Sequence, residues 1–207
     1  MASFGRRKKH AAALELAFAV LMPLRASGAA PPWLLHVAAG TGPVVGGAQD
    51  GVGIGLAVGP EIGALWRVAP NWALGGYGAY AFCMGGDIGG HLFRTGLELR
   101  WMPGDSGRAT RAAGWIQGQL GVAGFYGLEQ TDVLTSIKSF VGGPTFGLSA
   151  GGDFRMGGGL LGDYLQTHPV WFELGGHVLG QLFPGAEASL AVPTVYVGID
   201  LGFRFDG

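Results

Sequence analysis

The chain has 207 residues, enough for one domain, but only 13% of them are charged, against roughly 25% in ordinary soluble domains. With 42 glycines and a mean hydropathy of +0.34, it has too few charges to cover a water-facing surface well. Its formal net charge of −1 gives no basic excess for nucleic acid, and the one cysteine, Cys83, allows no internal disulfide.

The first thirty residues have the pattern of a secretory signal peptide. A basic start at residues 6–9 precedes a mostly apolar stretch over 11–24 and small residues over 26–30. We expect a cleavable signal peptide over 1–29 and a single domain over 30–207. The alternative, an uncleaved anchor, would need about 20 apolar residues, more than this stretch supplies.

Alternation with period two recurs along the rest of the chain and predicts eight strands. We expect them at about 33–39, 52–68, 72–82, 93–101, 116–122, 145–155, 170–181 and 195–205. We expect four of the connections to face away from the cell: 40–51, 83–90, 127–139 and 183–193. Of these, 127–139 is the preferred contact for a partner or surface glycan. The connection over 102–113 is long for a turn between neighbouring antiparallel strands at the opposite end.

One face of each strand carries large aliphatic and aromatic residues, and the other carries glycine, alanine and charges. If the bulky faces pointed inward, the exterior would be mostly glycine. Outward bulky faces suit lipid, so the sequence predicts an all-β fold, an eight-stranded antiparallel up-and-down transmembrane β-barrel. We also expect aromatic girdles near the strand ends, formed by Trp33, Trp66, Trp72, Trp101, Trp115, Phe125 and Tyr126.

The end of the chain carries the most specific pattern. Alternating apolar residues finish in an aromatic and are followed by Asp206 and Gly207; they are Val197, Ile199, Leu201, Phe203 and Phe205. This strand, with the signal peptide and the alternation over 31–207, resembles the small outer-membrane β-barrel proteins of Gram-negative bacteria, of the OmpX or OmpW kind. The resemblance implies location in the cell outer membrane, contact with its lipid, and a final strand that the barrel-assembly machinery reads.

Charged residues on the small faces form a repeated pattern. Each even-numbered strand has an arginine near its end and a carboxylate that precedes it on the same face: Arg67 with Glu61, Arg100 with Glu98, Arg155 with Asp153, and Arg204 with Asp200. Arg94 and Glu173 complete a balanced set of five basic and five acidic residues. Because unpaired charges in a narrow lumen are costly, we expect a cross-strand salt-bridge lattice that closes the barrel. The alternative is an arginine ring that selects anions in a thin pore.

Catalysis has weak support in the sequence. Glu173 and His177 share a face but lie about 13 Å apart along a strand. Ser149, His177 and Asp200 form a Ser/His/acid set only if register brings them together, and they would point inward, away from a lipid substrate. We expect no enzyme activity, no metal and no cofactor.

Three functions remain at this point. The first is a non-catalytic outer-membrane barrel with a structural or surface-interaction role, and a closed barrel has no edge that demands a partner, so we expect a monomer. The second is a narrow passive channel for small solutes or apolar compounds. The third is a soluble, secreted, lipocalin-like barrel that binds a ligand against its apolar face.

Overall fold

The structure, a computed structural model, describes residues 32–48, 51–85, 88–103, 111–130, 135–156, 169–184, 186 and 192–207. The predicted signal peptide over 1–29 lies outside these residues. Eight strands are present: β1 (Trp33–Ala48), β2 (Gly51–Ala69), β3 (Trp72–Met84), β4 (Gly90–Trp101), β5 (Ala112–Gln130), β6 (Thr135–Arg155), β7 (Val170–Gln181) and β8 (Val192–Asp206). No helix in the described part of the chain is long and apolar enough to cross a membrane.

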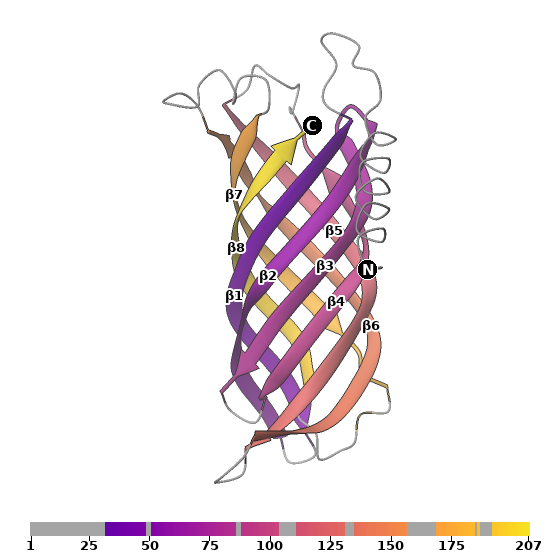
Figure 1. The fold of residues 1–207 in the computed structure, drawn as a ribbon, viewed down its shortest axis with the longest axis vertical. Helices are drawn as coiled ribbons and strands as arrows, with labels where there is room; N and C mark the ends of the chain where they lie inside the picture. The colour runs from indigo at the N-terminus through magenta and orange to yellow at the C-terminus, as the bar shows by residue number, and fades with distance from the viewer. Residues whose placement is uncertain are drawn as a thin grey trace, which may run out of the picture.

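The strands pair in sequence order, every pair is antiparallel, and β8 returns to β1, so the sheet is a closed barrel. The seam is in register from Leu34 opposite Asp206 to Thr41 opposite Ile199. Figure 1 shows tilted strands wrapped into a tall cylinder, with the start of β1 beside the end of β8. The end of the cylinder that holds them is called the terminal end here, and the opposite one the distal end.

The outward face of the barrel is apolar. Thirty-two large hydrophobic side chains are exposed, from Val37 in β1 to Phe205 in β8. Among residues whose side chains are described, Arg111, in the connection before β5, is the one exposed charged residue. The lipocalin-like alternative is therefore wrong, because it requires these apolar faces to line the interior.

The inward face is filled rather than hollow. At the distal end, residues including Val44, Leu92, Phe125, Leu179 and Tyr196 form an apolar cluster. A smaller apolar cluster, Leu34, Leu65, Ala73, Met102 and Trp115, lies at the terminal end. Polar and charged side chains occupy the lumen between and beside these clusters, as expected for eight strands, whose interior is just wide enough for side chains.

Several strand boundaries differ from the prediction. β1 continues to Ala48 and β2 begins at Gly51, so most of the expected loop over 40–51 is strand. β5 continues to Gln130 and β6 begins at Thr135, so the segment 127–139, expected as a long loop, is mostly a β-ladder. The expected connections over 83–90 and 183–193 lie close to the observed ones, between β3 and β4 and between β7 and β8.

Two predicted girdle residues point into the barrel. Trp115 is 4% exposed and Phe125 is 0% exposed, because both share the parity of the inward glutamines Gln117 and Gln119 in β5. Trp66 and Trp72 do face outward, at the terminal end. The girdle prediction was therefore wrong for Trp115 and Phe125, whose bulk instead packs the lumen.

Candidate functional site

The lumen charges form the candidate site. All ten predicted residues lie on inward-facing positions of their strands, and eight of them, all but Arg67 and Arg155, form ion pairs with side chains of other strands: Glu61, Arg67, Arg94, Glu98, Arg100, Asp153, Arg155, Glu173, Asp200 and Arg204. Arg67 and Arg155 are half-buried near the strand ends at the terminal end, and both have interactions. The rest are buried or half-buried.

Four strands supply a charge cluster at the terminal end. Arg100 of β4 donates to Glu173 Oε1 of β7 at 2.7 Å and to Asp153 Oδ1 of β6 at 3.3 Å. Arg204 of β8 pairs with Asp153 Oδ2 and, at 3.0 Å, with Asp206 Oδ1. Asp153 thus bridges two arginines, and the chain of ion pairs crosses the lumen between strands that are not neighbours in the sheet.

Two tryptophans cover the arginines of this cluster. The Arg100 guanidinium lies 4.3 Å from the centre of a Trp115 ring, and that of Arg204 lies 4.5 Å from Trp171. Trp171 Nε1 also donates to Asp206 Oδ2 at 3.0 Å. Stacking on an aromatic face and binding carboxylates at its edge offset part of the cost of burying a guanidinium.

A second group of polar residues occupies the middle of the lumen. His36 Nε2 of β1 lies 3.1 Å from Glu98 Oε2 of β4. Arg94 donates to Glu61 Oε2 at 3.4 Å, and Gln119 Nε2 donates to Glu61 Oε1 at 2.6 Å. These contacts again join strands across the interior.

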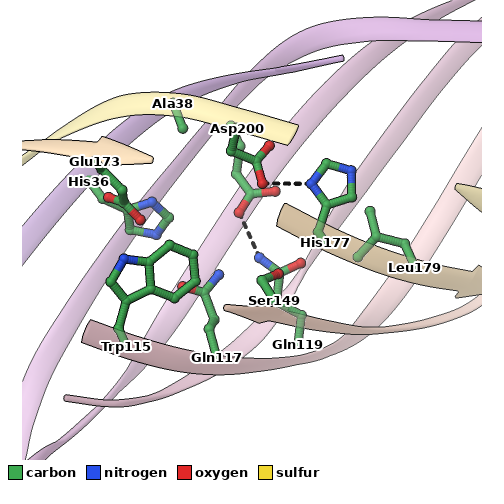
Figure 2. Close-up of a pocket in the computed structure, with 11 residues that line it drawn as sticks. His36, Ala38, Trp115, Gln117, Gln119, Ser149, Glu173, His177, Leu179 and Asp200 are labelled. Carbon is green, nitrogen blue, oxygen red and sulfur yellow. Dashed lines mark hydrogen bonds and ion pairs between the residues drawn. The ribbon is translucent and has the colours of Figure 1, made fainter. Parts of the chain in front are cut away.

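His177 and Asp200 form a third pair, with His177 Nδ1 2.6 Å from Asp200 Oδ2. Ser149 is the register partner of His177 on β6. Figure 2 shows Ser149, His177 and Asp200 around one cavity, together with His36 and Gln119. The cavity measures about 10 Å³, the space of a single water molecule, so the Ser/His/acid set has no room for a substrate.

The ion pairs do not follow the four arginine and carboxylate sets that lie along single strands. Arg100 binds Asp153 and Glu173 rather than Glu98, and Arg204 binds Asp153 and Asp206 rather than Asp200. Glu98 and Asp200 instead contact histidines. The sets therefore mark inward positions along the strands and not ion pairs, because the lumen is narrow enough for opposite walls to meet.

Four contributors were missed: His36, Gln119, Trp171 and Asp206. Each lies at an inward-facing position of its strand, so the same alternation could have found them. Asp206 matters most, because it extends β8 inward beyond Phe205 and holds both Arg204 and Trp171. With it, the lumen has six acidic residues against five arginines rather than a balanced set.

The five residues of the expected assembly signal lie on the opposite face of β8. They are exposed on the outward wall: Val197, Ile199, Leu201, Phe203 and Phe205. Phe203 packs edge-on against Phe172 of β7, with ring centroids 6.1 Å apart. That an assembly machinery recognises these five residues remains a prediction.

Neither a protein-family model nor a curated protein sequence matches the chain. Among solved structures, it is similar to the neisserial surface protein NspA, with a TM-score of 0.53 and 10% identity over 86% of this chain and 99% of that one. The N-terminal β-barrel domain of OprF from Pseudomonas aeruginosa follows at TM-score 0.44 and 12% identity, covering 86% of this chain and 99% of that one. At 10% identity the likeness to NspA is one of fold, and the chain has the fold of the small eight-stranded outer-membrane β-barrels.

Proposed function

We propose that the chain is an integral outer-membrane β-barrel protein with a closed lumen and a structural or surface-interaction role, without catalysis. The observation that carries the proposal is the outward wall. Its described strand positions hold thirty exposed large hydrophobic residues and no exposed charged one.

Lipid is the solvent that suits this wall. A monomeric protein in water rarely exposes an apolar patch larger than a few hundred Å², whereas this apolar face continues around all eight strands. A closed ring of strands also satisfies its backbone hydrogen bonds internally, as the bilayer core requires. The twelve residues of β4 and β7, the shortest strands, exceed the 9–11 that a tilted strand needs to span a membrane.

The filled interior supports a closed lumen. The terminal-end charge cluster joins β4, β6, β7 and β8, and Arg100, Asp153 and Arg204 within it are fully buried. The apolar cluster around Phe125 and Tyr196 fills the distal end. An ion would have to separate buried pairs to pass, and separating them leaves uncompensated charge.

The location can be tested by fractionation and by gel mobility. We expect the protein in the outer-membrane fraction, extractable by detergent and not by salt or alkali. On a gel, an unheated sample should migrate differently from a heated one. A protein released by alkali, with the same mobility in both states, would overturn the membrane proposal.

The closed lumen can be tested in planar bilayers. We expect the refolded wild-type barrel to show no steady current, because the ion pairs stay closed. The Arg100→Ala variant should show raised or flickering conductance, and Arg111→Ala, which alters an exposed residue, should behave as the wild type. A steady anion-selective current in the wild type that Arg100→Ala abolishes would favour the channel instead.

A further inference from the structure

Three potential metal ligands from three strands converge in the middle of the lumen. They are His36 of β1, Glu61 of β2 and Glu98 of β4, and one ligand atom from each lies within 4.8 Å of the other two. His36 and Glu98 are buried, and Glu61 is half-buried. One imidazole and two carboxylates are a donor set that suits a divalent transition metal better than calcium or magnesium, which prefer oxygen ligands.

The geometry of the group is close to that of a coordination sphere. His36 Nε2 and Glu98 Oε2 are 3.1 Å apart, and two ligands of a tetrahedral zinc ion with bonds of about 2.05 Å lie about 3.3 Å apart. Gln119 donates to Glu61 Oε1 at 2.6 Å and fixes the orientation of that carboxylate, as outer partners of metal ligands do. A side chain at Gly63 would overlap His36 Nε2, so the glycine leaves the space that the group needs.

A second observation also points to a ligand. Glu98 is fully buried, and its other oxygen, Oε1, is enclosed without a hydrogen-bond partner. A buried carboxylate oxygen left this way is costly unless something positive binds it. The long Arg94 to Glu61 contact, 3.4 Å, is directed at Glu61 and not at this oxygen.

The net charge around the three ligands also favours binding of a cation. The middle of the lumen holds three carboxylates, Glu61, Glu98 and Asp200, against one arginine, Arg94, an excess of two negative charges before the histidines are counted. A divalent cation neutralises that excess. Arg94 lies on the far side of Glu61 Oε2 and contributes the remaining positive charge.

We propose that the lumen binds one divalent transition metal ion of the zinc class through His36 Nε2 and the carboxylates of Glu61 and Glu98, with water in the fourth position. The metal takes the place of the proton that lies between Nε2 and Glu98, and that proton moves to Nδ1 of the neutral ring or is released to solvent. It ties β1, β2 and β4 together across the interior. This inference goes beyond the proposed membrane role and does not depend on whether the lumen conducts.

Within the described residues, side chains cover the site toward both ends of the barrel. The distal apolar cluster and the terminal-end charge cluster lie on its two sides. The metal therefore enters while the barrel folds, and the experiment must supply it at that stage. The mature chain is refolded in detergent with Zn²⁺, freed of loose metal by chelator and gel filtration, and analysed for zinc by atomic absorption.

We expect about one zinc ion per folded wild-type chain. His36→Gln and Glu98→Gln should each lower the retained zinc at least about tenfold. The matched control is His91→Gln: His91 faces outward, its Nδ1 lies 2.7 Å from the Tyr80 hydroxyl, and its loss should change nothing. A difference in gel mobility between heated and unheated samples shows which variants are folded.

Zinc absent from the folded wild type would overturn the proposal. So would folded His36→Gln and Glu98→Gln variants that retain as much zinc as the wild type. If neither variant folds, the wild type refolded with Co²⁺ decides. Retained cobalt with the strong visible absorption of a four-coordinate ion supports the site, and cobalt lost to the chelator refutes it. A conducting barrel that retains zinc would contradict the closed lumen alone, so the two proposals fail separately.

Discussion

Asp153 is the carboxylate on which the terminal-end charge cluster depends. It is fully buried and accepts hydrogen bonds from both Arg100 and Arg204. Removing its charge leaves the buried Arg100 guanidinium paired with Glu173 and that of Arg204 paired with Asp206.

Asp153→Asn should therefore lower the free energy of unfolding by about 3–5 kcal/mol, the usual cost of breaking a buried ion pair. Urea unfolding in detergent micelles, followed by gel mobility, measures this change. Arg111→Ala removes an exposed charge and should stay within about 0.5 kcal/mol of the wild type. Equal stability of Asp153→Asn and the wild type would show that the cluster contributes nothing.

Gly63 is a second position where one residue type is needed. A Cβ there would overlap the His36 imidazole, whereas a Cβ at Gly78, on the outward face of β3, would meet nothing within 4 Å. Gly63→Ala should cost about 1–3 kcal/mol through overpacking, and Gly78→Ala should be near neutral. Equilibrium unfolding of the two variants gives the comparison, and equal effects would mean that His36 moves aside freely.

At this scale the sequence predicted which side chains point inward but not which ones meet. Parity placed Arg100 and Glu98 on the lumen side correctly. Their partners depend on strand tilt, register and the width of the barrel, none of which is encoded in alternation. Glu98 therefore contacts His36, 62 residues away in the chain, and not the arginine two residues along its own strand.

At the scale of the element, each strand separates two environments, and β5 does so clearly. Leu120 is 65% exposed on its outward face and lies mid-strand, opposite Leu97 and Phe146. Its neighbour Gln119 is buried in the lumen.

Leu120→Arg should destabilise the folded barrel in lipid by about 2–4 kcal/mol, because the charge enters the hydrocarbon region. Asn71→Arg, in the exposed turn between β2 and β3, should cost about 0–1 kcal/mol, as expected near the interface. Folding titrations in phospholipid vesicles measure both. Similar costs at the two positions would contradict a bilayer centred on mid-strand.

β8 combines lumen charges on one face with the expected assembly signal on the other. Phe205→Ala should reduce the amount of folded, heat-modifiable barrel in the outer membrane of a Gram-negative host, because the aromatic end is the part we expect to be read. Phe154→Ala, an outward aromatic on β6 at the same end, is the control. If both variants lower the yield equally, the effect is loss of apolar contact and not of recognition.

The strand ends were predicted least well, for an identifiable reason. In residues 40–47 the inward positions Gly40, Gly42 and Gly46 carry no bulk, so the alternation fades although the ladder with β2 continues. Trp115 was misplaced by a different error, because nearness to a strand end was given more weight than parity. The eight strands and their outward faces needed only period-two patterning, which the fold confirms.

At the scale of the whole molecule, the connections are distributed unusually. The two longest that join strands at the terminal end are those over 102–111 and 156–169, whereas outer-membrane barrels commonly have short periplasmic turns at the end that holds the start of the first strand and the end of the last. Chain termini in the periplasm nevertheless remain the expectation, because the final strand is the one expected to meet the assembly machinery there.

Thiol labelling of whole cells tests this orientation. Gly89→Cys, at the distal end, should react with a membrane-impermeant maleimide in intact cells. Asn71→Cys, at the terminal end, should react only after the outer membrane is permeabilised. The wild type serves as background, since Cys83 is fully buried. The reverse labelling pattern would place the termini and the long connections outside the cell.

The position of Arg204 has a consequence for the order in which the barrel forms. β8 closes the ring by pairing with β1 and β7, and the same strand brings the guanidinium that binds Asp153 of β6. Sealing the hydrogen-bonded wall and completing the charge cluster around Asp153 are thus one event. A chain stalled before its last strand docks keeps an open edge and an under-compensated carboxylate together, which makes the incomplete barrel short-lived and the finished one the first state that persists.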